Sequence, residues 1–147
     1  MARKIIPHLS DKEFSRALNV MPTVVVEVLV KDSTGKILLG RRNTTPFKGM
    51  WQFTGGFVYK DEKVSDAAKR IAKREIGIDI KIDKFIGFYE YIKKDPRGHL
   101  IALVYSAKEI RGVISPTLDN TELKFFGRPP KNIVSFHKKI FMDALRT

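Results

Sequence analysis

The sequence predicts one α/β domain in which a mixed β-sheet lies between helices, and three observations lead to this prediction. Residues 23–30 form a run of mostly β-branched side chains, which is the composition of a buried strand. Residues 64–76 and 133–145 carry apolar side chains three and four positions apart, the spacing of a single helix face. A chain of 147 residues also has an ordinary length for one domain, so residues 1–147 are predicted to fold as a unit.

Residues 1–20 are expected to form an N-terminal extension that contains one short helix. Ser10 opens the pattern Ser-Asp-Lys-Glu, a capping box that starts a helix reaching about Leu18. Phe14 and Leu18 are four positions apart and are expected to point inward. The predicted role of this helix is packing against the domain or contact with a second copy of the chain.

A hairpin and a glycine-rich loop are predicted next. The turn residues at 32–35 indicate that the strand at 23–30 returns through residues 36–42 as its partner. A short strand near residues 51–53 then leads into Gly55-Gly56, where the backbone can approach a ligand closely.

The helix at 64–76 is expected to end at Gly77, which suits the left-handed conformation that follows a last helical turn. The residues after it alternate or are apolar, break near Asp83 and contain one turn. They predict strands at 78–82 and 84–92, a turn at 95–98 and a strand at 99–106 that pairs with the one before it.

The composition excludes several classes of protein and of site. There is no cysteine, which excludes disulfides and thiolate metal sites. No apolar run is long enough for a membrane span or a secretory signal, so a soluble cytoplasmic protein is expected. The 28 Lys and Arg against 16 Asp and Glu give a formal charge of +12, which fits either phosphorylated small substrates or a lysine-rich surface. Lysines are spread along the chain without interleaved aromatics, which argues against a dedicated nucleic-acid groove.

The stretch 55–78 resembles the loop and helix of the Nudix family, whose box is G-x5-E-x7-R-E-U-x-E-E-x-G-U with U aliphatic. The matching positions are Gly56, Glu62, Arg70, Ala72, Glu75, Gly77 and Ile78. Two glutamates of the box are replaced, by Ile71 and Arg74. This pattern is similar to the GDP-mannose mannosyl hydrolase branch, and it implies a Nudix-type α/β/α sandwich. Box glutamates gather two or three magnesium ions, so a site with one helix carboxylate should hold fewer.

The resemblance also implies a set of site residues. The loop at 116–123 is expected to precede a strand entered at 124–126, and this alignment places Asn120 among the metal ligands. The predicted ligands of Mg²⁺, with Mn²⁺ as a substitute, are the Gly55 carbonyl, Glu75 and Asn120. Arg42 is expected to neutralise a leaving diphosphate, and Arg70 to orient the ligands or touch phosphate. Glu122, or with less support Asp119, is expected to activate water.

The implied function is Mg²⁺-dependent hydrolysis of a nucleotide sugar such as GDP-mannose, with water attacking the anomeric carbon. Charge then stays on an intact leaving diphosphate, which one ion and an arginine can stabilise, whereas attack at phosphorus calls for more metal. Two alternatives stay open: ordinary Nudix pyrophosphohydrolysis of a nucleoside diphosphate derivative such as ADP-ribose, and a Nudix domain that binds nucleotide or RNA without turnover. Relatives in this branch are homodimers, and a homodimer is expected here.

Overall fold

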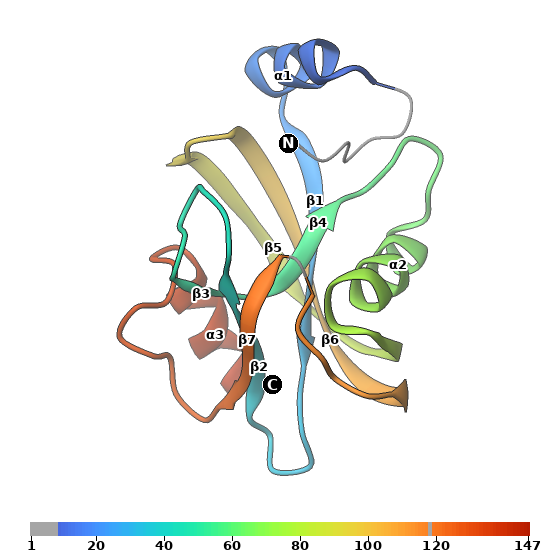
Figure 1. The fold of residues 1–147 in the computed structure, drawn as a ribbon, viewed down its shortest axis with the longest axis vertical. Coiled ribbons are helices and arrows are strands. Elements are labelled where there is room, and N and C mark those ends of the chain that lie inside the picture. Colours follow the sequence, from blue (N-terminus) through green and yellow to red (C-terminus); the bar gives the residue numbers. More distant parts are fainter. Residues whose placement is uncertain (1–8, 118) are drawn as a thin grey trace.

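The computed structural model describes residues 9–117 and 119–147, and it places helices on both sides of two small β-sheets (Figure 1). The elements in chain order are α1 (Asp11–Val20), β1 (Thr23–Val30), β2 (Ile37–Arg42), β3 (Trp51–Gln52), β4 (Thr54–Phe57), α2 (Val64–Ile76), β5 (Ile78–Asp95), β6 (Gly98–Gly112), β7 (Asn120–Phe126) and α3 (His137–Leu145). Within the described residues, no helix is both long and apolar enough to cross a membrane.

The larger sheet has four strands in the order β4-β1-β6-β5. It is mixed, because β1 runs parallel to β6 and antiparallel to β4. The smaller sheet has the order β3-β2-β7 and is antiparallel throughout. Helices α2 and α3 pack into separate apolar clusters on opposite sides of these strands (Figure 1). The predicted fold class, a mixed sheet between helices, is confirmed.

The predicted hairpin between residues 23–30 and 36–42 is wrong. Strands β1 and β2 lie in different sheets and meet only at an isolated bridge between Lys31 and Ile37. The turn itself forms, since Asp32 Oδ1 accepts the backbone N–H groups of Thr34 at 2.9 Å and Lys36 at 3.0 Å. The reason is that β1 pairs with β4 along one edge and with β6 along the other. Strand β2 pairs instead with β3 and β7 in the second sheet.

Helix α2 has the limits that the sequence predicts. Five side chains on its apolar face are fully buried, and alanines among them let the helix approach the sheet closely; they are Ala67, Ala68, Ile71, Ala72 and Ile76. Gly77 follows in the left-handed conformation, with φ of 76°, and its N–H bonds to the Lys73 carbonyl. This helix therefore carries its polar residues to a fixed place beside Gly55 and Gly56. The predicted glycine-rich loop is wrong, because both glycines belong to strand β4, which pairs with β1.

Helix α1 is confirmed together with its capping box. Ser10 Oγ accepts the N–H of Glu13 at 3.2 Å, and a Glu13 carboxylate oxygen accepts the N–H of Ser10 at 2.8 Å. Phe14 packs edge-on against Phe57, with ring centroids 5.3 Å apart, so the helix rests on the end of β4. Residues 1–8 lie outside the described part, and the single-domain assignment of 1–147 and homodimerisation through this helix stay predictions.

Four later elements differ from the predicted limits. One is β6, which continues to Gly112 beyond the predicted strand at 99–106. Strand β5 runs on through Asp83, because a register shift between Ile82 and Lys84 leaves that residue out of the ladder without ending the strand. Strand β7 already begins at Asn120, which is paired with Arg42. The predicted helix at 133–145 starts only at His137, since the residues before it bond with β3 instead.

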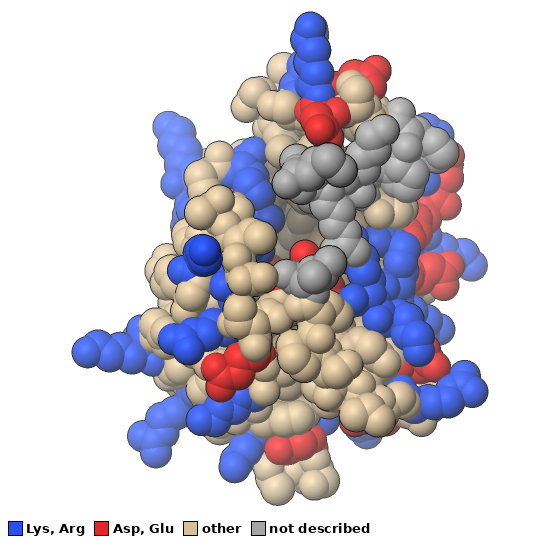
Figure 2. Space-filling model, in the orientation of Figure 1, with Lys and Arg blue, Asp and Glu red and all other residues tan. Residues whose placement is uncertain are grey.

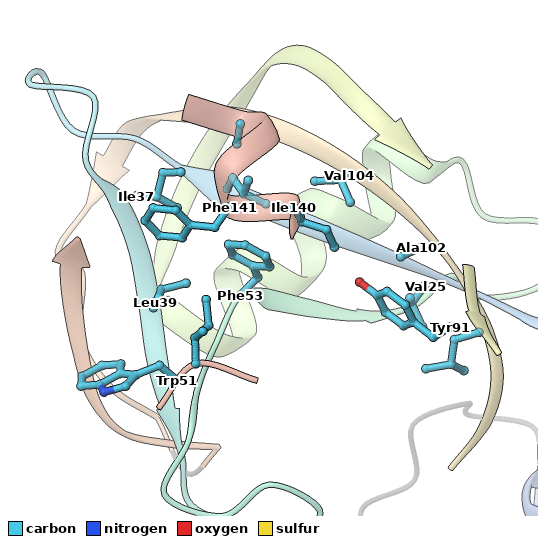
Figure 3. Close-up of a cluster of buried hydrophobic side chains, with 14 of the residues drawn as sticks. Val25, Ile37, Leu39, Trp51, Phe53, Tyr91, Ala102, Val104, Ile140 and Phe141 are labelled. Carbon is cyan, nitrogen blue, oxygen red and sulfur yellow. The ribbon is translucent and has the colours of Figure 1, made fainter. Parts of the chain in front are cut away.

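Figure 3 shows the apolar cluster on the α3 side, and Tyr91 in this cluster belongs to a buried polar network. The Glu27 carboxylate accepts the Tyr91 hydroxyl at 2.9 Å and lies 3.0 Å from His137 Nε2. The other ring nitrogen of His137, Nδ1, accepts the backbone N–H of Phe53 at 3.5 Å. This hydrogen-bond pattern assigns the proton of the neutral ring to Nε2, where it can be donated to Glu27. The network links β1, β5 and α3 to Phe53, which lies between β3 and β4.

Candidate functional site

Glu75, near the end of α2, is the buried carboxylate of the site. One of its oxygens accepts the N–H of Gly55 at 3.2 Å, and the other lies 3.3 Å from Nη2 of Arg74. Burial raises the pKa of Glu75 to about 7, and the nearby charge of Asp119 acts in the same direction; Arg74 and the Gly55 N–H oppose it. The carboxylate is therefore held in place while its charge is only partly compensated.

The Gly55 backbone faces this carboxylate rather than the neighbouring strand. Gly55 is opposite Glu27 in the β1–β4 ladder, and its N–H is directed to Glu75. In an antiparallel strand the N–H and C=O of one residue point to the same edge, so the Gly55 carbonyl also points away from β1. The predicted use of that carbonyl as a metal ligand stays a prediction, with an orientation that suits it.

Arg42 ends β2 on the same side of the molecule. Its guanidinium is fixed by Nη1 to Gln52 Oε1 at 3.2 Å and by Nε to the Thr44 carbonyl at 3.2 Å. Burial is the main influence on its pKa and lowers it, and the charge of Arg97 lowers it further. The acidic groups that act on the pKa of Arg42 in the opposite sense are Glu75, Asp95 and Asp119.

Asn120, which pairs with Arg42 in the β2–β7 ladder, has an unsatisfied side-chain oxygen. Its side chain is buried, and among the described residues its Oδ1 has no hydrogen-bond partner. The amide occupies the space above Gly40, where a Cβ would come within 2.7 Å of Asn120 Cγ and closer still to Oδ1. Gly40 thus leaves room for an amide oxygen that lacks a protein donor, which is the arrangement expected of a metal ligand.

Substituting Gly40 by alanine should displace the Asn120 amide without removing any polar group. We expect G40A to lower Mn²⁺ affinity and turnover by about 10- to 100-fold, because an added methyl group forces the ligand out of position. The matched control is G127A, since a Cβ at Gly127 meets only the Lys36 side chain at 3.8 Å. Equal Mn²⁺ affinities for G40A and G127A, measured by calorimetry, would show that Asn120 is not a metal ligand.

The carboxylate that the structure brings to this group is Asp119, whereas Glu122 lies elsewhere. Glu122 pairs with Arg41 Nη1 at 3.6 Å, and Arg41 points to the opposite face of β2 from Arg42, toward Trp51. A bulge in the β2–β7 ladder between Arg41 and Arg42 gives β7 an extra residue and separates the positions of Asn120 and Glu122. The water-activating role predicted for Glu122 therefore finds no support in its position.

Arg70 and Glu62, the other charged residues of the box, hold the loop together. Arg70 bonds to both Glu62 oxygens at 2.8 and 3.0 Å and to the Phe57 carbonyl at 2.8 Å. Its guanidinium also lies over the Tyr59 ring, 3.8 Å from the centroid. The hydrogen bond from Arg70 lowers the pKa of Glu62 and keeps it ionised. Of the two roles predicted for Arg70, orienting the loop matches these contacts, and a phosphate contact stays a prediction.

Sequence reasoning missed two features of the site. Arg97, in the turn between β5 and β6, influences Arg42 and is bound to Asp95 at 2.6 and 2.9 Å. Gln52 fixes Arg42 from β3. No local signal marks either residue, because each reaches the site through strand pairing. Basic side chains also gather over α2 on the face shown in Figure 2, which suits an anionic ligand.

The donors present fit a hard divalent cation, but with few charges. Oxygen ligands suit Mg²⁺ or Mn²⁺, and Glu75, Asn120 Oδ1 and the Gly55 carbonyl supply such atoms. Nowhere in residues 9–117 and 119–147 do three or more acidic, histidine or cysteine side chains form a group able to hold a metal ion. The binding of fewer ions than in a site with the full set of glutamates stays a prediction.

Comparison with known proteins gives consistent matches. A family model described as NUDIX domain matches residues 21–139. The chain is 34% identical over 146 residues to the "ADP-ribose pyrophosphatase" of Methanocaldococcus jannaschii, covering 99% of this chain and 85% of that protein. It is 28% identical over 150 residues to the "Low-salt glycan biosynthesis protein Agl8" of Haloferax volcanii, covering 98% and 95%.

Solved structures show the same fold. A MutT NUDIX hydrolase from Burkholderia pseudomallei aligns with a TM-score of 0.74 and 25% identity, covering 86% of this chain and 97% of that one. A MutT protein from Methanosarcina mazei Go1 aligns with a TM-score of 0.73 and 20% identity, covering 85% and 94%.

Proposed function

The chain belongs to the Nudix family, and from this membership and the site geometry we propose that it hydrolyses nucleoside diphosphate sugars with Mg²⁺, ADP-ribose first among them. The observation that carries the proposal is the convergence of Glu75, Asp119 and Arg42 beside Gly55 of β4. A carboxylate suited to a metal ion, a second carboxylate and a guanidinium suited to phosphate thus influence one another electrostatically, which supports the proposal. ADP-ribose is preferred because it appears in the name of the relative that is 34% identical.

The metal would be held by Glu75, Asn120 and the Gly55 carbonyl, with Mn²⁺ able to replace Mg²⁺. A bound Mg²⁺ would neutralise charge on the diphosphate and make its phosphorus more electrophilic. The rest of the site is supplied by the chain itself. Arg42, fixed by Gln52 and Thr44, binds the diphosphate, because a planar guanidinium matches two phosphate oxygens.

Asp119, rather than Glu122, is the residue that we propose to accept a proton from the attacking water. Its charge acts on both Glu75 and Arg42, so it stands within the same electrostatic environment as the ligand and the anion site. Arg70 takes part as a positioning residue, since it fixes the loop through Glu62 and Phe57. In this arrangement Asp119 accepts the proton of the attacking water near the negative charge of Glu75.

A second candidate, attack at the anomeric carbon of a sugar such as GDP-mannose, is favoured by the low number of carboxylates. Leaving the diphosphate intact needs less neutralisation than attack at phosphorus. A relative involved by name in glycan biosynthesis is compatible with this candidate. The two candidates require different substrates, because in GDP-mannose the diphosphate is attached to the anomeric carbon, whereas in ADP-ribose it is attached to C5 of the second ribose.

Incubation with Mg²⁺ in oxygen-18 water, with ADP-ribose and GDP-mannose as substrates, decides between them. We expect AMP and ribose phosphate from ADP-ribose, with one oxygen-18 atom on a phosphate, as measured by mass spectrometry. Labelled mannose beside intact GDP would establish the second candidate instead. The absence of product from both substrates and from other nucleoside diphosphate sugars would reject hydrolysis and leave a domain that binds nucleotide or RNA.

A further inference from the structure

Arg74 occupies a position that is glutamate in the Nudix box, and its guanidinium lies at the site. Nη2 of Arg74 is 3.3 Å from Glu75 Oε1, and a Cβ at Gly56 would be 3.7 Å from that same nitrogen. The side chain is 25% exposed, so it is neither free in solvent nor fully enclosed. Arg74 therefore lies between the Glu75 carboxylate and Gly56 of β4.

One donor of this guanidinium is buried and has no acceptor. Nε of Arg74 is inaccessible to solvent, and among the described residues it has no hydrogen-bond partner. Arg70, on the same helix, differs in this respect, since its Nε and Nη2 are both bonded to the loop. A buried donor without an acceptor is unfavourable, so contacts within the described part of the chain do not fully satisfy this guanidinium. The 25% of the side chain that is exposed remains open to an oxygen atom of a ligand.

The replacement also changes the charge of the site by the amount that one divalent cation would supply. A glutamate at position 74 would add one negative charge, whereas Arg74 adds one positive charge. The arginine is permanently charged and presents a planar set of donors that matches phosphate oxygens. Arg74 thus provides a cation within the protein next to the Glu75 carboxylate. In proteins with the full Nudix box, several metal ions gather at the glutamates of this helix.

We propose that Arg74 is a substrate-binding residue that takes the place of a second metal ion and binds an oxygen of the substrate's diphosphate. This inference rests on the proposed function, because it assumes that a diphosphate enters beside Glu75. It assigns to this chain a site in which one metal ion and two arginines, Arg42 and Arg74, share the charge of the ligand. Binding of a diphosphate should therefore persist in part when no metal is present.

The test compares R74Q with K73Q by titrating each with ADP in EDTA, using calorimetry. Lys73 is adjacent on α2, is 60% exposed and pairs with Asp79 at 3.7 Å, so K73Q removes the same charge outside the site. We expect R74Q to weaken ADP binding at least about tenfold and K73Q by less than about twofold. R74K should restore only part of the affinity, because an ammonium lacks the planar fork.

A second measurement separates substrate binding from simple neutralisation of Glu75. Titration with Mn²⁺, followed by electron paramagnetic resonance, should show tighter binding by R74Q than by the parent protein, since the competing cation beside Glu75 is gone. R74E should bind Mn²⁺ more tightly again and take up an additional ion. Melting temperatures of all variants show whether the fold is kept.

Several outcomes would overturn the inference: equal losses of ADP affinity in R74Q and K73Q, unchanged ADP affinity in R74Q, or no ADP binding by the parent protein in EDTA. The outcome for the proposed function is separate. A selective loss of ADP binding in R74Q supports the inference even if no substrate is hydrolysed. Hydrolysis of ADP-ribose with unchanged ADP affinity in R74Q would reject the inference alone.

Discussion

Replacing Glu75 by glutamine should abolish turnover and at the same time stabilise the metal-free protein. Turnover is expected to fall at least about a hundredfold, because the carboxylate that the site offers to the metal is lost while the Gly55 contact can remain. The expected gain in stability follows from the same burial. The pKa of Glu75 is about 7 in the folded chain against an ordinary value of 4.5.

The direction of the pH dependence follows from these two values. Between pH 4.5 and about 7 the unfolded chain has lost the Glu75 proton while the folded chain keeps it, so the folded state loses stability as the pH rises. Above pH 7 the loss is complete. Glutamine cannot ionise, so E75Q should be more stable than the parent protein at pH 8 in EDTA, by about 1–3 kcal/mol, and equally stable near pH 4.

Thermal unfolding at pH 4 and pH 8, with and without Mn²⁺, measures this effect. E109Q is the matched control, because it makes the same chemical change at an exposed residue of β6. Undiminished turnover by E75Q would show that Glu75 does not hold the catalytic metal. Lost turnover together with a lower melting temperature at pH 8 would instead indicate damage to the fold.

Replacing His137 by leucine is expected to destabilise the protein by about 3–5 kcal/mol, because a buried charge loses one partner. His137 and Glu27 side chains are 6% and 8% exposed, so water cannot replace the missing donor. Among the side chains that the structure describes, Glu27 would keep only the Tyr91 hydroxyl, and the Phe53 N–H would lose its acceptor. The free energy of unfolding from urea titration measures the change.

Two further variants identify the cause of that loss. Y91F removes one neutral donor from Glu27 and should cost only about 1–2 kcal/mol. The double variant E27L/H137L removes the charge together with its partner and should be more stable than H137L alone, since well-packed apolar residues tolerate the site better than an unpaired carboxylate. A double variant less stable than either single one would show that packing, rather than charge, dominates at this position.

The parts of the structure that follow from local sequence were predictable, and the parts that depend on strand pairing were not. The limits of α2 follow from the spacing of its apolar residues and from Gly77, because helix bonds join residues close in sequence. The prediction of a β1–β2 hairpin was wrong because the turn residues are a local signal, whereas β1 pairs with β4 and β6, which come later in the chain.

The same distinction applies to the site. The Nudix box pointed to Glu75 and Arg70, and the wider family resemblance pointed to Arg42. The choice between Asp119 and Glu122 depended on one extra residue in β7, a bulge that sequence patterns do not reveal, and it decides which side chain faces the cluster. The contact of Arg74 with Glu75 could not be predicted either, because neighbouring helix residues point in different directions. The long Arg74 side chain bends back to reach the carboxylate.

The parallel pairing of β1 with β6 has a consequence for synthesis on the ribosome. Thr23 pairs with Leu100 and Val30 with Ala107, so the central strand of the large sheet cannot complete its ladder until most of the chain has emerged. During that time an apolar segment that is buried in the finished protein stays available to other chains. Chaperone demand during translation should therefore depend on the arrival of β6 rather than on the completion of α2.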